Sequence, residues 1–342
     1  MKLATFDVVT PAGDIRRIGA VSGKYLVDLN YAYAAFLKSK EKIRCRQLAN
    51  AVVPPDMIEF LEGGEESLEA ARQAVNFVQE KLAAPTDITG PQGEKVAYLH
   101  EEIKLRAPIP RPRKVIETGS NFNEHVTELN EVKVAGWDQF KDFLKTSDIP
   151  SGFLKASNCV IGHEEDIIHP RTTEKLDYEV ELGIVIGKRG RYIKQDDAYD
   201  YIVGYTCHCD VSARDIQVNE QANRLVLIGK SMDTFCPLGP YIVTKDEVPD
   251  PTNIRVQTFV DGESRQDSYT SNMIHSVPKL VSWWSQLTLE PGDIITSGTP
   301  GGVAGFRAPD PTPYFLRPGQ TLEVKIEGVG TLRNRIVADQ DQ

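Results

Sequence analysis

Short runs of alternating hydrophobic and polar residues open the chain. The segments Leu3–Val9, Arg17–Val21 and Tyr25–Leu29 alternate in this way, and Thr-Pro-Ala-Gly and Ser-Gly-Lys sequences stand between them. A period of two is typical of a half-buried strand, and Gly or Pro between such runs favours a turn. The pattern therefore predicts several strands near the N-terminus.

A helical period follows between Ser67 and Leu82. Apolar residues recur there every three to four positions, and Ser67 is of a type that caps helix N-termini. The stretch 85–93 is then rich in Pro, Gly, Thr and Asp, and further prolines come soon after it. We therefore expect a small N-terminal α+β domain over residues 1–108 and a second domain over residues 109–342.

The rest of the chain has many turn signals and few helical patches. Turn sequences such as Asp261-Gly262 lie between alternating apolar runs. Helical spacing is confined to residues 122–130, 137–145, 196–201 and 277–286. Many short strands with few helices indicate a sandwich or closed roll instead of a doubly wound sheet. The expected fold class is α+β, mostly β.

Composition and charge narrow the class of protein. The chain has 342 residues, with 39 Lys and Arg against 49 Asp and Glu, so its formal net charge is −10. This balance argues against a general nucleic-acid binder, which needs basic residues to replace phosphate counterions. It does not exclude an anionic substrate, because a few local cations or a metal can reverse the field in one pocket.

Membrane and disulfide signals are weak. The longest stretch without Asp, Glu, Lys or Arg, residues 294–306, is broken by Gly, Ser and Pro, whereas a membrane span needs roughly 20 apolar residues. The first residues lack the apolar core of a signal peptide, and the five cysteines follow no framework spacing. We expect a cytoplasmic protein with no nucleic-acid or membrane partner.

An acidic strand is the sharpest local feature. Apolar residues alternate between Leu176 and Ile186, so Asp177, Glu179 and Glu181 share the opposite face, with successive Cβ atoms about 7 Å apart. One interpretation is a strand with a solvated acidic face. The other is a strand that enters the interior, where carboxylates repel one another unless a cation neutralises them.

A further carboxylate has a similar context. Residues 202–209 predict a buried strand that ends at Asp210. Together with the acidic strand, Asp210 forms a set of oxygen ligands that suits Mg²⁺, Mn²⁺ or Ca²⁺ better than zinc. Cys207-His208-Cys209 does not indicate zinc, because strand alternation separates the histidine from the cysteines and no second ligand pair has suitable spacing. Buried structural thiols are the better interpretation.

Two other segments carry groups that catalyse or bind. His125 and Glu128 are three residues apart in a predicted helix, so the carboxylate can orient the imidazole as a general base, with an ordinary surface pair as the alternative. The segment 227–231 resembles the end of a phosphate loop, but Arg224 stands where that loop requires glycine. Lys230 is therefore either a cation at a pocket or a solvated lysine.

Taken together and in order, these segments resemble the fumarylacetoacetate hydrolase family over about residues 114–337. The matching pieces are Gly119-Ser120-Asn121-Phe122 with His125 and Glu128, Phe153-Leu154-Lys155, Asp177-Tyr178-Glu179-Val180-Glu181-Leu182, Asp210-Val211-Ser212-Ala213-Arg214-Asp215-Ile216-Gln217, Gly229-Lys230-Ser231-Met232-Asp233-Thr234-Phe235, Gly239-Pro240 and Gly298-Thr299-Pro300-Gly301-Gly302-Val303. The acidic strand and the Ser-Ala-Arg-Asp segment are highly specific in combination.

The resemblance implies a mixed β-sandwich roll, a homodimer and a divalent metal, above all Mg²⁺, with Mn²⁺ or Ca²⁺ as alternatives. The metal ligands that it implies are Glu179, Glu181 and Asp210. The catalytic residues that it implies are His125, Glu128 and Lys230. The residues that it places near the substrate are Arg214, Gln217 and Thr299, with an ion-pair role as the alternative for Arg214.

The chain departs from the family pattern next to the metal ligand Asp210, after Lys155 and in the segment after Glu128. Cys209 stands where members commonly have Asn, so a hydrogen bond that supports the site is lost or replaced. Ala156 stands where Pro is frequent. Residues 131–151, with Trp137, Phe140 and Phe143 at helical spacing, form either an extended lid or a helix packed on the body.

The activity that the resemblance implies is metal-dependent hydrolysis of a C–C bond in a β-diketo acid of the acylpyruvate type, in the catabolism of aromatic or related compounds. His125, oriented by Glu128, would deprotonate water, while the metal and Lys230 would stabilise the departing pyruvate enolate. The alternative is a decarboxylase, hydratase or isomerase of a 2-oxo acid or diacid with the same metal–enolate chemistry. A non-catalytic binding protein that kept the fold is the third hypothesis.

Overall fold

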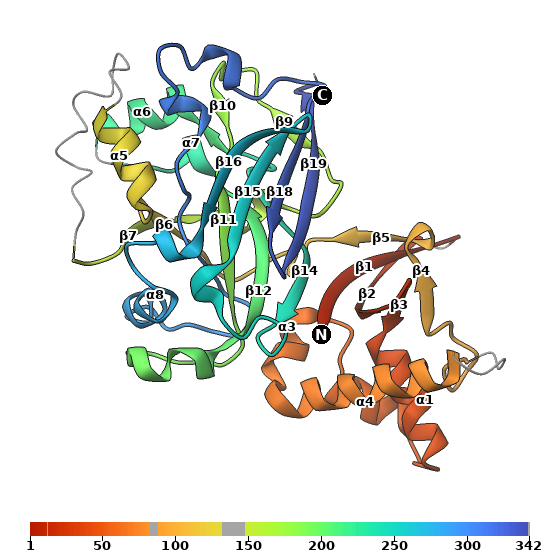
Figure 1. Ribbon diagram of the computed structural model, residues 1–342. Coiled ribbons are helices and arrows are strands. Elements are labelled where there is room, and N and C mark those ends of the chain that lie inside the picture. Colours follow the sequence, from red (N-terminus) through yellow and green to blue (C-terminus); the bar gives the residue numbers. More distant parts are fainter. Residues whose placement is uncertain (12, 83–87, 132–147, 224, 341–342) are drawn as a thin grey trace.

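Two β-sheets pack face to face in the larger part of the molecule (Figure 1). The computed structural model describes residues 1–11, 13–82, 88–131, 148–223 and 225–340. One sheet has 12 strands, the other has 5, and a pair of short strands stands apart. This architecture confirms the predicted fold class, α+β with mostly β structure, and the predicted mixed β-sandwich roll.

The larger sheet follows the order β4-β3-β2-β1-β14-β12-β11-β17-β6-β7, and β5 and β8 pair with β1 and β14. Its strands are β1 (Lys2–Thr10), β2 (Gly13–Ser22), β3 (Tyr25–Asp28), β4 (Ala97–Leu99), β5 (Ile103–Arg106), β6 (Val115–Gly119), β7 (Ser151–Lys155), β8 (Val160–Ile161), β11 (Val180–Ile186), β12 (Ile202–Cys209), β14 (Cys236–Thr244) and β17 (Ile294–Thr296). The smaller sheet follows the order β16 (Glu263–Tyr269), β15 (Arg255–Val260), β18 (Thr321–Ile326), β19 (Gly330–Ala338), β9 (Ile167–His169). The separate pair is β10 (Leu176–Asp177) and β13 (Ser212–Ala213).

Strand alternation separates an apolar layer from a polar one. Leu182 of β11 lies opposite Cys207 of β12, whose thiol donates to the Gly330 carbonyl oxygen of β19 at 3.3 Å. This face therefore packs on the smaller sheet. Glu181 and His208 are also opposite each other, and as the intervening residues they point to the other side of the sheet.

The larger sheet curls so strongly that side chains from distant strands meet. β6 and β12 are three strand positions apart, which in a flat sheet would be roughly 14 Å at the usual interstrand spacing. Glu117 of β6 nevertheless lies 2.9 Å from His208 of β12, measured from Oε1 to Nε2. The roll therefore encloses the polar side of β11, and charged residues on that side are buried.

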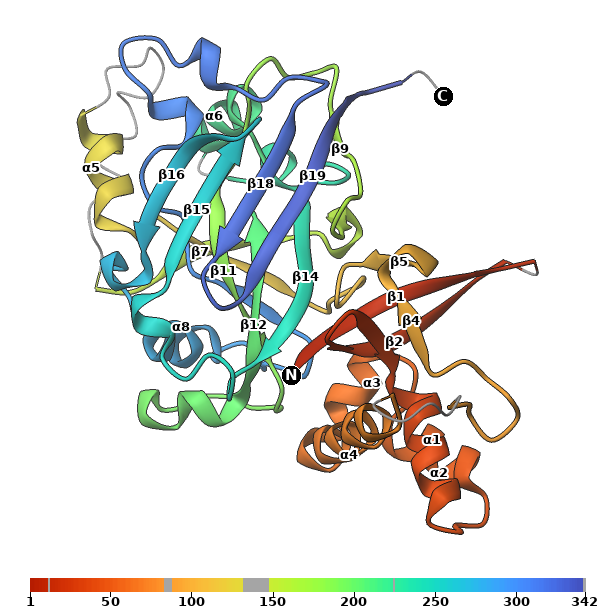
Figure 2. The same ribbon diagram turned by 45° about the vertical axis from the view of Figure 1, so that its right-hand side comes forward.

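The N-terminal strands form a lobe beside the sandwich, with four helices against them (Figures 1 and 2). The helices are α1 (Leu29–Ser39), α2 (Cys45–Val52), α3 (Met57–Glu62) and α4 (Gly64–Leu82). The three strands predicted from alternation are confirmed as β1, β2 and β3. Since Leu3 of β1 pairs with Ile242 of β14, hydrogen bonding continues from the lobe into the sandwich. The division at residues 108 and 109 stays a prediction.

Most predicted helices that lie in the described residues are present, but their first and last residues differ from the prediction. The helix predicted to begin at Ser67 begins at Gly64 instead, and the Ser67 hydroxyl donates to the Val52 carbonyl oxygen of α2, so the predicted cap is wrong. The segments 122–130 and 277–286 correspond to α5 (Asn123–Glu131) and α8 (Val277–Trp284), and 196–201 is a 3₁₀ helix, η4 (Gln195–Tyr201). The remaining α-helices among the described residues are α6 (Arg214–Ala222) and α7 (Ile228–Ser231). The segment 137–145 lies outside the described residues.

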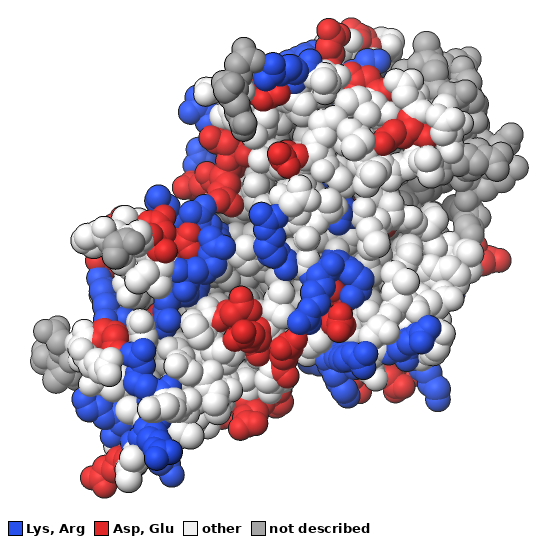
Figure 3. Space-filling model, turned by 180° about the vertical axis from the view of Figure 1, so that it is seen from behind, with Lys and Arg blue, Asp and Glu red and all other residues white. Residues whose placement is uncertain are grey.

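Surface charge is dispersed on the face shown in Figure 3. The residues drawn there intersperse Lys and Arg with Asp and Glu, without a continuous basic stripe. Such a mixed surface lacks the electrostatic footprint of a nucleic-acid site. Among the helices in the described ranges, none is long and apolar enough to cross a membrane.

A buried ion pair ties α1 to the N-terminal strands, and breaking it should destabilise the lobe. Arg17 Nε and Nη2 donate to the two carboxylate oxygens of Asp28 at 2.7 and 3.0 Å, and Asp28 also accepts the Tyr31 amide at the start of α1. Arg17→Met leaves a buried carboxylate without its partner, so we expect a loss of about 3–5 kcal/mol in urea unfolding. The control Arg72→Met, at an exposed pair with Glu65, should cost less than about 1 kcal/mol. An equal loss of unfolding free energy in the two variants would contradict the stabilising role of the buried pair.

Candidate active site

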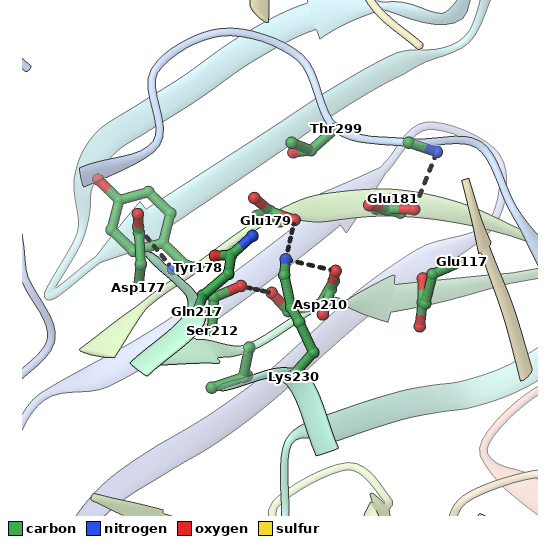
Figure 4. Close-up of polar contacts among 12 residues, drawn as sticks. Glu117, Asp177, Tyr178, Glu179, Glu181, Asp210, Ser212, Gln217, Lys230 and Thr299 are labelled. Atoms are coloured by element: carbon green, nitrogen blue, oxygen red, sulfur yellow. Dashed lines mark hydrogen bonds and ion pairs between the residues drawn. The ribbon is translucent and has the colours of Figure 1, made fainter. Parts of the chain in front are cut away.

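Three carboxylates from separate strands meet inside the roll. Glu117 of β6, Glu181 of β11 and Asp210 just after β12 place ligand oxygens within 4.8 Å of one another, and each residue is at most 2% exposed. Figure 4 shows these side chains facing one another, with Lys230 reaching in from α7. The cluster is an all-oxygen arrangement of the kind that hard divalent cations prefer.

The acidic segment is not a solvated face. Glu179 is 5% exposed and Asp177 is fully buried, so the interior interpretation of this segment is correct. The segment is also not one continuous strand, because β10 ends at Asp177 and β11 begins at Val180. Asp177 turns aside to accept the backbone amides of Ala304 and Gly305, each at 2.8 Å. The prediction that Asp177 shares one face of a continuous strand with Glu179 and Glu181 is therefore wrong.

Cations hold Glu179 from both sides. Its two oxygens accept from Arg214 Nη2 at 2.6 Å and from Lys230 Nζ at 2.8 Å. Burial alone would raise the pKa of Glu179, but Lys230 and Arg214 outweigh burial and hold that pKa far below its usual range. His125 acts on this pKa in the same direction.

Asp210 lies between two ammonium groups. Lys230 Nζ donates to its Oδ2 at 2.6 Å, and Lys155 Nζ of β7 lies 2.7 Å from its Oδ1. Lys155 also donates to the backbone carbonyl oxygen of Lys230, so the two lysines are fixed relative to each other. Burial raises the pKa of Asp210, and the two ammonium groups offset this effect only in part.

Glu181 is the carboxylate without a cation. Within the described ranges it forms no salt bridge, and its Oε2 accepts the Gly298 amide at 2.9 Å. Gly298 has φ +79°, and a Cβ there would lie 2.8 Å from the Asn121 side chain, so the glycine-rich loop can approach Glu181 only through glycine. Burial, Glu117 and Asp210 raise the pKa of Glu181 well above 4.5. This excess buried charge fits a divalent cation.

The structure places two of the three predicted ligands in the compact cluster. Glu181 and Asp210 belong to the cluster, and Glu117 is its third member. Glu179 is not a member, and its carboxylate accepts hydrogen bonds from Lys230 and Arg214. Sequence reasoning missed Glu117. The available signal was a charged residue within the apolar strand Val115–Gly119, where burial requires a partner.

His125 and Glu128 lie on α5, and Glu128 contacts the same glycine-rich loop that contacts Glu181. His125 Nδ1 and Glu128 Oε2 are 3.7 Å apart, and these two buried atoms have no hydrogen-bond partner among the described residues. Glu128 Oε1 accepts the Gly302 amide at 2.6 Å, and the imidazole packs edge-on against Phe306 with ring centroids 5.5 Å apart. A small shift closes the histidine–glutamate bond, and such bonds are often long before substrate binds.

The residues predicted near the substrate have different surroundings. Arg214 is buried, and its guanidinium bonds to Asp177 at 2.7 Å, Glu179 at 2.6 Å and Gln217 at 3.0 Å, as an ion-pair role requires. Thr299 is 3% exposed, and its hydroxyl oxygen accepts from Gln266 at 2.9 Å. Substrate contacts by Arg214, Gln217 and Thr299 stay predictions.

The cysteines near the site are buried free thiols, as predicted for Cys207 and Cys209. Burial raises the pKa of Cys207 to about 12. Neither belongs to a group of candidate metal ligands among the described residues, whereas His208, the residue between them, does. Strand alternation therefore separates the histidine from the cysteines, as the sequence predicts.

The raised pKa of Glu181 predicts a pH-dependent response to metal. The unfolded chain loses this proton near pH 4.5, whereas the metal-free native protein keeps it to higher pH. The stability that this group contributes is thus complete below pH 4.5 and is lost as pH rises through the raised pKa. Since a cation binds the ionised carboxylate, the gain in melting temperature with Mg²⁺ over EDTA should grow from about pH 5 to about pH 8. A gain that does not change with pH would contradict this assignment.

Comparison with known proteins identifies the class to which this fold and site belong. The chain belongs to the fumarylacetoacetate hydrolase family, because the model for the C-terminal domain of that hydrolase matches residues 114–337. This finding confirms the family expected from the sequence motifs.

Individual relatives cover nearly the whole chain. The mitochondrial oxaloacetate tautomerase FAHD2A of Bos taurus is 36% identical over 338 residues, which are 98% of this chain and 92% of that protein. The oxaloacetate tautomerase YisK of Bacillus subtilis (strain 168) is 37% identical over 320 residues, which are 90% of this chain and 97% of that protein. The chain is therefore similar to tautomerases along its full length.

Solved structures share the same fold. A 5-carboxymethyl-2-hydroxymuconate delta-isomerase from Mycobacterium smegmatis is 27% identical with a TM-score of 0.66, and the match covers 100% of both chains. A fumarylacetoacetate hydrolase from psychrophilic Exiguobacterium antarcticum is 29% identical with a TM-score of 0.70, and the match covers 98% of this chain and 100% of that one. Isomerases and hydrolases thus share this architecture.

Proposed function

We propose that the protein is a metal-dependent tautomerase that interconverts the keto and enol forms of a 2-oxo diacid, with oxaloacetate as the first candidate substrate. The observation that carries the proposal is Glu181, a buried carboxylate that forms no salt bridge among the described residues and places a ligand oxygen within 4.8 Å of those of Glu117 and Asp210. The names of the two relatives described above support the choice of substrate. This proposal replaces the hydrolase preferred from the sequence by its alternative, an isomerase with the same chemistry.

The carboxylates would hold the metal at the centre of the roll. The proposed ligands are Glu179, Glu181 and Asp210, and Mg²⁺ is the proposed ion, with Mn²⁺ and Ca²⁺ as alternatives. When bound, the metal polarises the 2-oxo group and stabilises negative charge on its oxygen. Lys155 and Lys230 neutralise two of the carboxylates, so the site with a divalent ion attracts an anionic substrate.

Proton transfer falls to the residues on α5 and α7. His125 takes the proton from C3 of the keto form, and Glu128 orients the imidazole and stabilises its charged form. The electron pair of the C–H bond forms the C2–C3 double bond, and the π pair of the carbonyl moves to the 2-oxo oxygen, where the Lys230 ammonium stabilises the charge. Return of the proton to that oxygen gives the enol, and the reverse sequence gives the ketone. No C–C bond breaks, and no water is consumed.

Product analysis tests this function. The chelated protein is supplied with Mg²⁺ or Mn²⁺ and incubated with oxaloacetate, or with an acylpyruvate, in D₂O, with the metal alone as the blank. We expect accelerated exchange of deuterium at C3 of oxaloacetate, with neither pyruvate nor CO₂ above the blank. Pyruvate from the acylpyruvate would favour the hydrolase, and CO₂ from oxaloacetate would favour a decarboxylase.

The assembly and location expected from the sequence are part of the same proposal. A homodimer would show twice the mass of one chain in light scattering after gel filtration, and a monomer at working concentration would contradict it. A cytoplasmic location stays a prediction, and the relatives that support the function come from mitochondria and from a bacterium.

A further inference from the structure

One carboxylate of the cluster, Glu117, forms a buried pair with an imidazole. Glu117 Oε1 and His208 Nε2 are 2.9 Å apart, and their side chains are 1% and 0% exposed. His208 lies opposite Glu181 across the β11–β12 ladder, and it is two residues before Asp210. The pair therefore lies next to the other two carboxylates of the cluster but has no role in the proton transfers proposed above.

The second nitrogen of His208 fixes the orientation of the ring. Nδ1 lies 3.0 Å from the carbonyl oxygen of Pro237 on β14, and because a carbonyl can only accept, the hydrogen-bond network assigns a proton to Nδ1. The bond between Nε2 and Glu117 must also contain a proton, on one side or the other. In both cases the Glu117–His208 pair has no net charge.

Glu117 is held from a second direction as well. Its Oε2 accepts from the Thr296 hydroxyl at 2.7 Å, while Oε1 is bonded to His208. A carboxylate oxygen has two lone pairs, so each oxygen keeps one for a further partner. Glu181 and Asp210 offer their own oxygens within 4.8 Å. Ligand oxygens around one Mg²⁺ or Ca²⁺ are about 3–5 Å apart, given metal–oxygen bonds of 2.0–2.6 Å.

We propose that Glu117 is a further carboxylate ligand of the divalent metal, beside Glu181 and Asp210, and that His208 is the residue that positions it. This inference rests on the proposed function, because it requires the metal site. Glu117 adds an oxygen ligand without adding net charge to a site that already contains three other carboxylates. Such an arrangement limits the repulsion among buried carboxylates while it completes the coordination of the ion.

A separate metal site at the same histidine is the weaker interpretation. Glu117, His208 and Cys236 also place potential ligand atoms within 4.8 Å of one another. The Cys236 sulfur, however, lies 3.8 Å from Nδ1, which is the nitrogen that donates to Pro237. A metal beside the thiol would have to break that bond, so the geometry favours a single site with Glu117 on its carboxylate side.

Metal affinity, measured by calorimetry with Mn²⁺ alone, tests the proposal without reference to activity. Glu117→Gln should weaken binding about tenfold or more, because even residues that only support a ligand are worth 10–100-fold in metal affinity. His208→Leu should change the affinity in the wild-type background and have no further effect in the Glu117→Gln background, since it acts through Glu117. The matched control is Asp293→Asn, which alters an equally buried carboxylate at its ion pair with Lys114 and should leave Mn²⁺ affinity unchanged.

The outcomes separate this inference from the proposed function. If the wild type binds Mn²⁺ and Glu117→Gln binds it equally well, the inference is wrong and the metal site stands. Independent, additive effects of the two substitutions would refute the positioning role of His208. If the wild type does not bind metal, the proposed function and this inference both fall. Should Glu117→Gln not fold, the paired change Glu117→Met with His208→Leu removes both polar groups together, and the same loss of affinity is expected.

Discussion

Glu181→Gln is expected to abolish metal-dependent catalysis while it stabilises the metal-free protein. The substitution removes the one carboxylate of the cluster that lacks a cation among the described residues, so the site loses its attraction for a divalent ion. Loss of several kcal/mol of charge stabilisation in the transition state corresponds to a decrease of about 10³-fold or more in kcat/KM. The raised pKa of Glu181 shows that its ionised form is unfavourable in the metal-free fold, so a neutral amide should raise the melting temperature in EDTA.

Two measurements decide this prediction. The melting temperature is recorded with EDTA and with Mg²⁺, and the rate is measured at saturating metal for the wild type, for Glu181→Gln and for the exposed control Glu164→Gln. The control should behave like the wild type. A variant that keeps its metal-induced shift and its rate would contradict the role assigned to Glu181. A wild type with neither a metal-induced shift nor a metal-dependent rate would instead support the third hypothesis, a non-catalytic binding protein that kept the fold.

His125→Asn should lower kcat by about 10²–10⁴-fold, the usual contribution of a general base. Metal affinity should stay close to that of the wild type, since the imidazole belongs to α5 and not to the carboxylate cluster. Glu128→Gln should have a smaller effect, because its oxygen can still accept the Gly302 amide and keep α5 in place while the charge that stabilises the imidazolium is lost. The rate and the metal affinity are measured for both variants.

The pattern of the two effects is as informative as their size. A loss of metal affinity in His125→Asn equal to the loss of rate would mean that the histidine shapes the metal site. Full activity of His125→Asn would remove the proposed base and leave Lys230 as the group to examine next.

The sequence predicted the parts of the site that local patterns determine. The alternation in β11 correctly placed Glu181 on the face opposite the core, and the end of β12 correctly placed Asp210 beside it. Such features depend on neighbours along one strand, which a period of two reveals. The same pattern left open whether the acidic strand is solvated or buried, and the structure shows that it is buried.

The parts that the sequence did not predict depend on distant contacts. Glu117 reaches His208 only because the sheet curls across three strand positions, and no local pattern contains that curvature. The strand break after Asp177 has a similar origin, since local alternation fits a continuous strand but the amides of Ala304 and Gly305 draw that carboxylate away. Ser67 is another example, because its hydroxyl bonds to α2 instead of capping its own helix.

The sequence also did not decide between hydrolysis and tautomerisation. Both reactions need a chelated 2-oxo acid, a base such as His125 and a cation such as Lys230, so these residues alone do not separate them. The chain is similar to two tautomerases along nearly its full length, and this similarity favours tautomerisation over hydrolysis.

The most direct measurement is the rate at which the enol form of oxaloacetate becomes the ketone, followed by the loss of enol absorbance. Metal is titrated into the chelated protein, with metal alone as the blank and Glu181→Gln as the inactive reference. The account predicts a rate that saturates with metal for the wild type, stays at the blank for Glu181→Gln and yields only the ketone. A wild-type rate equal to the blank at every metal concentration would contradict the central claim.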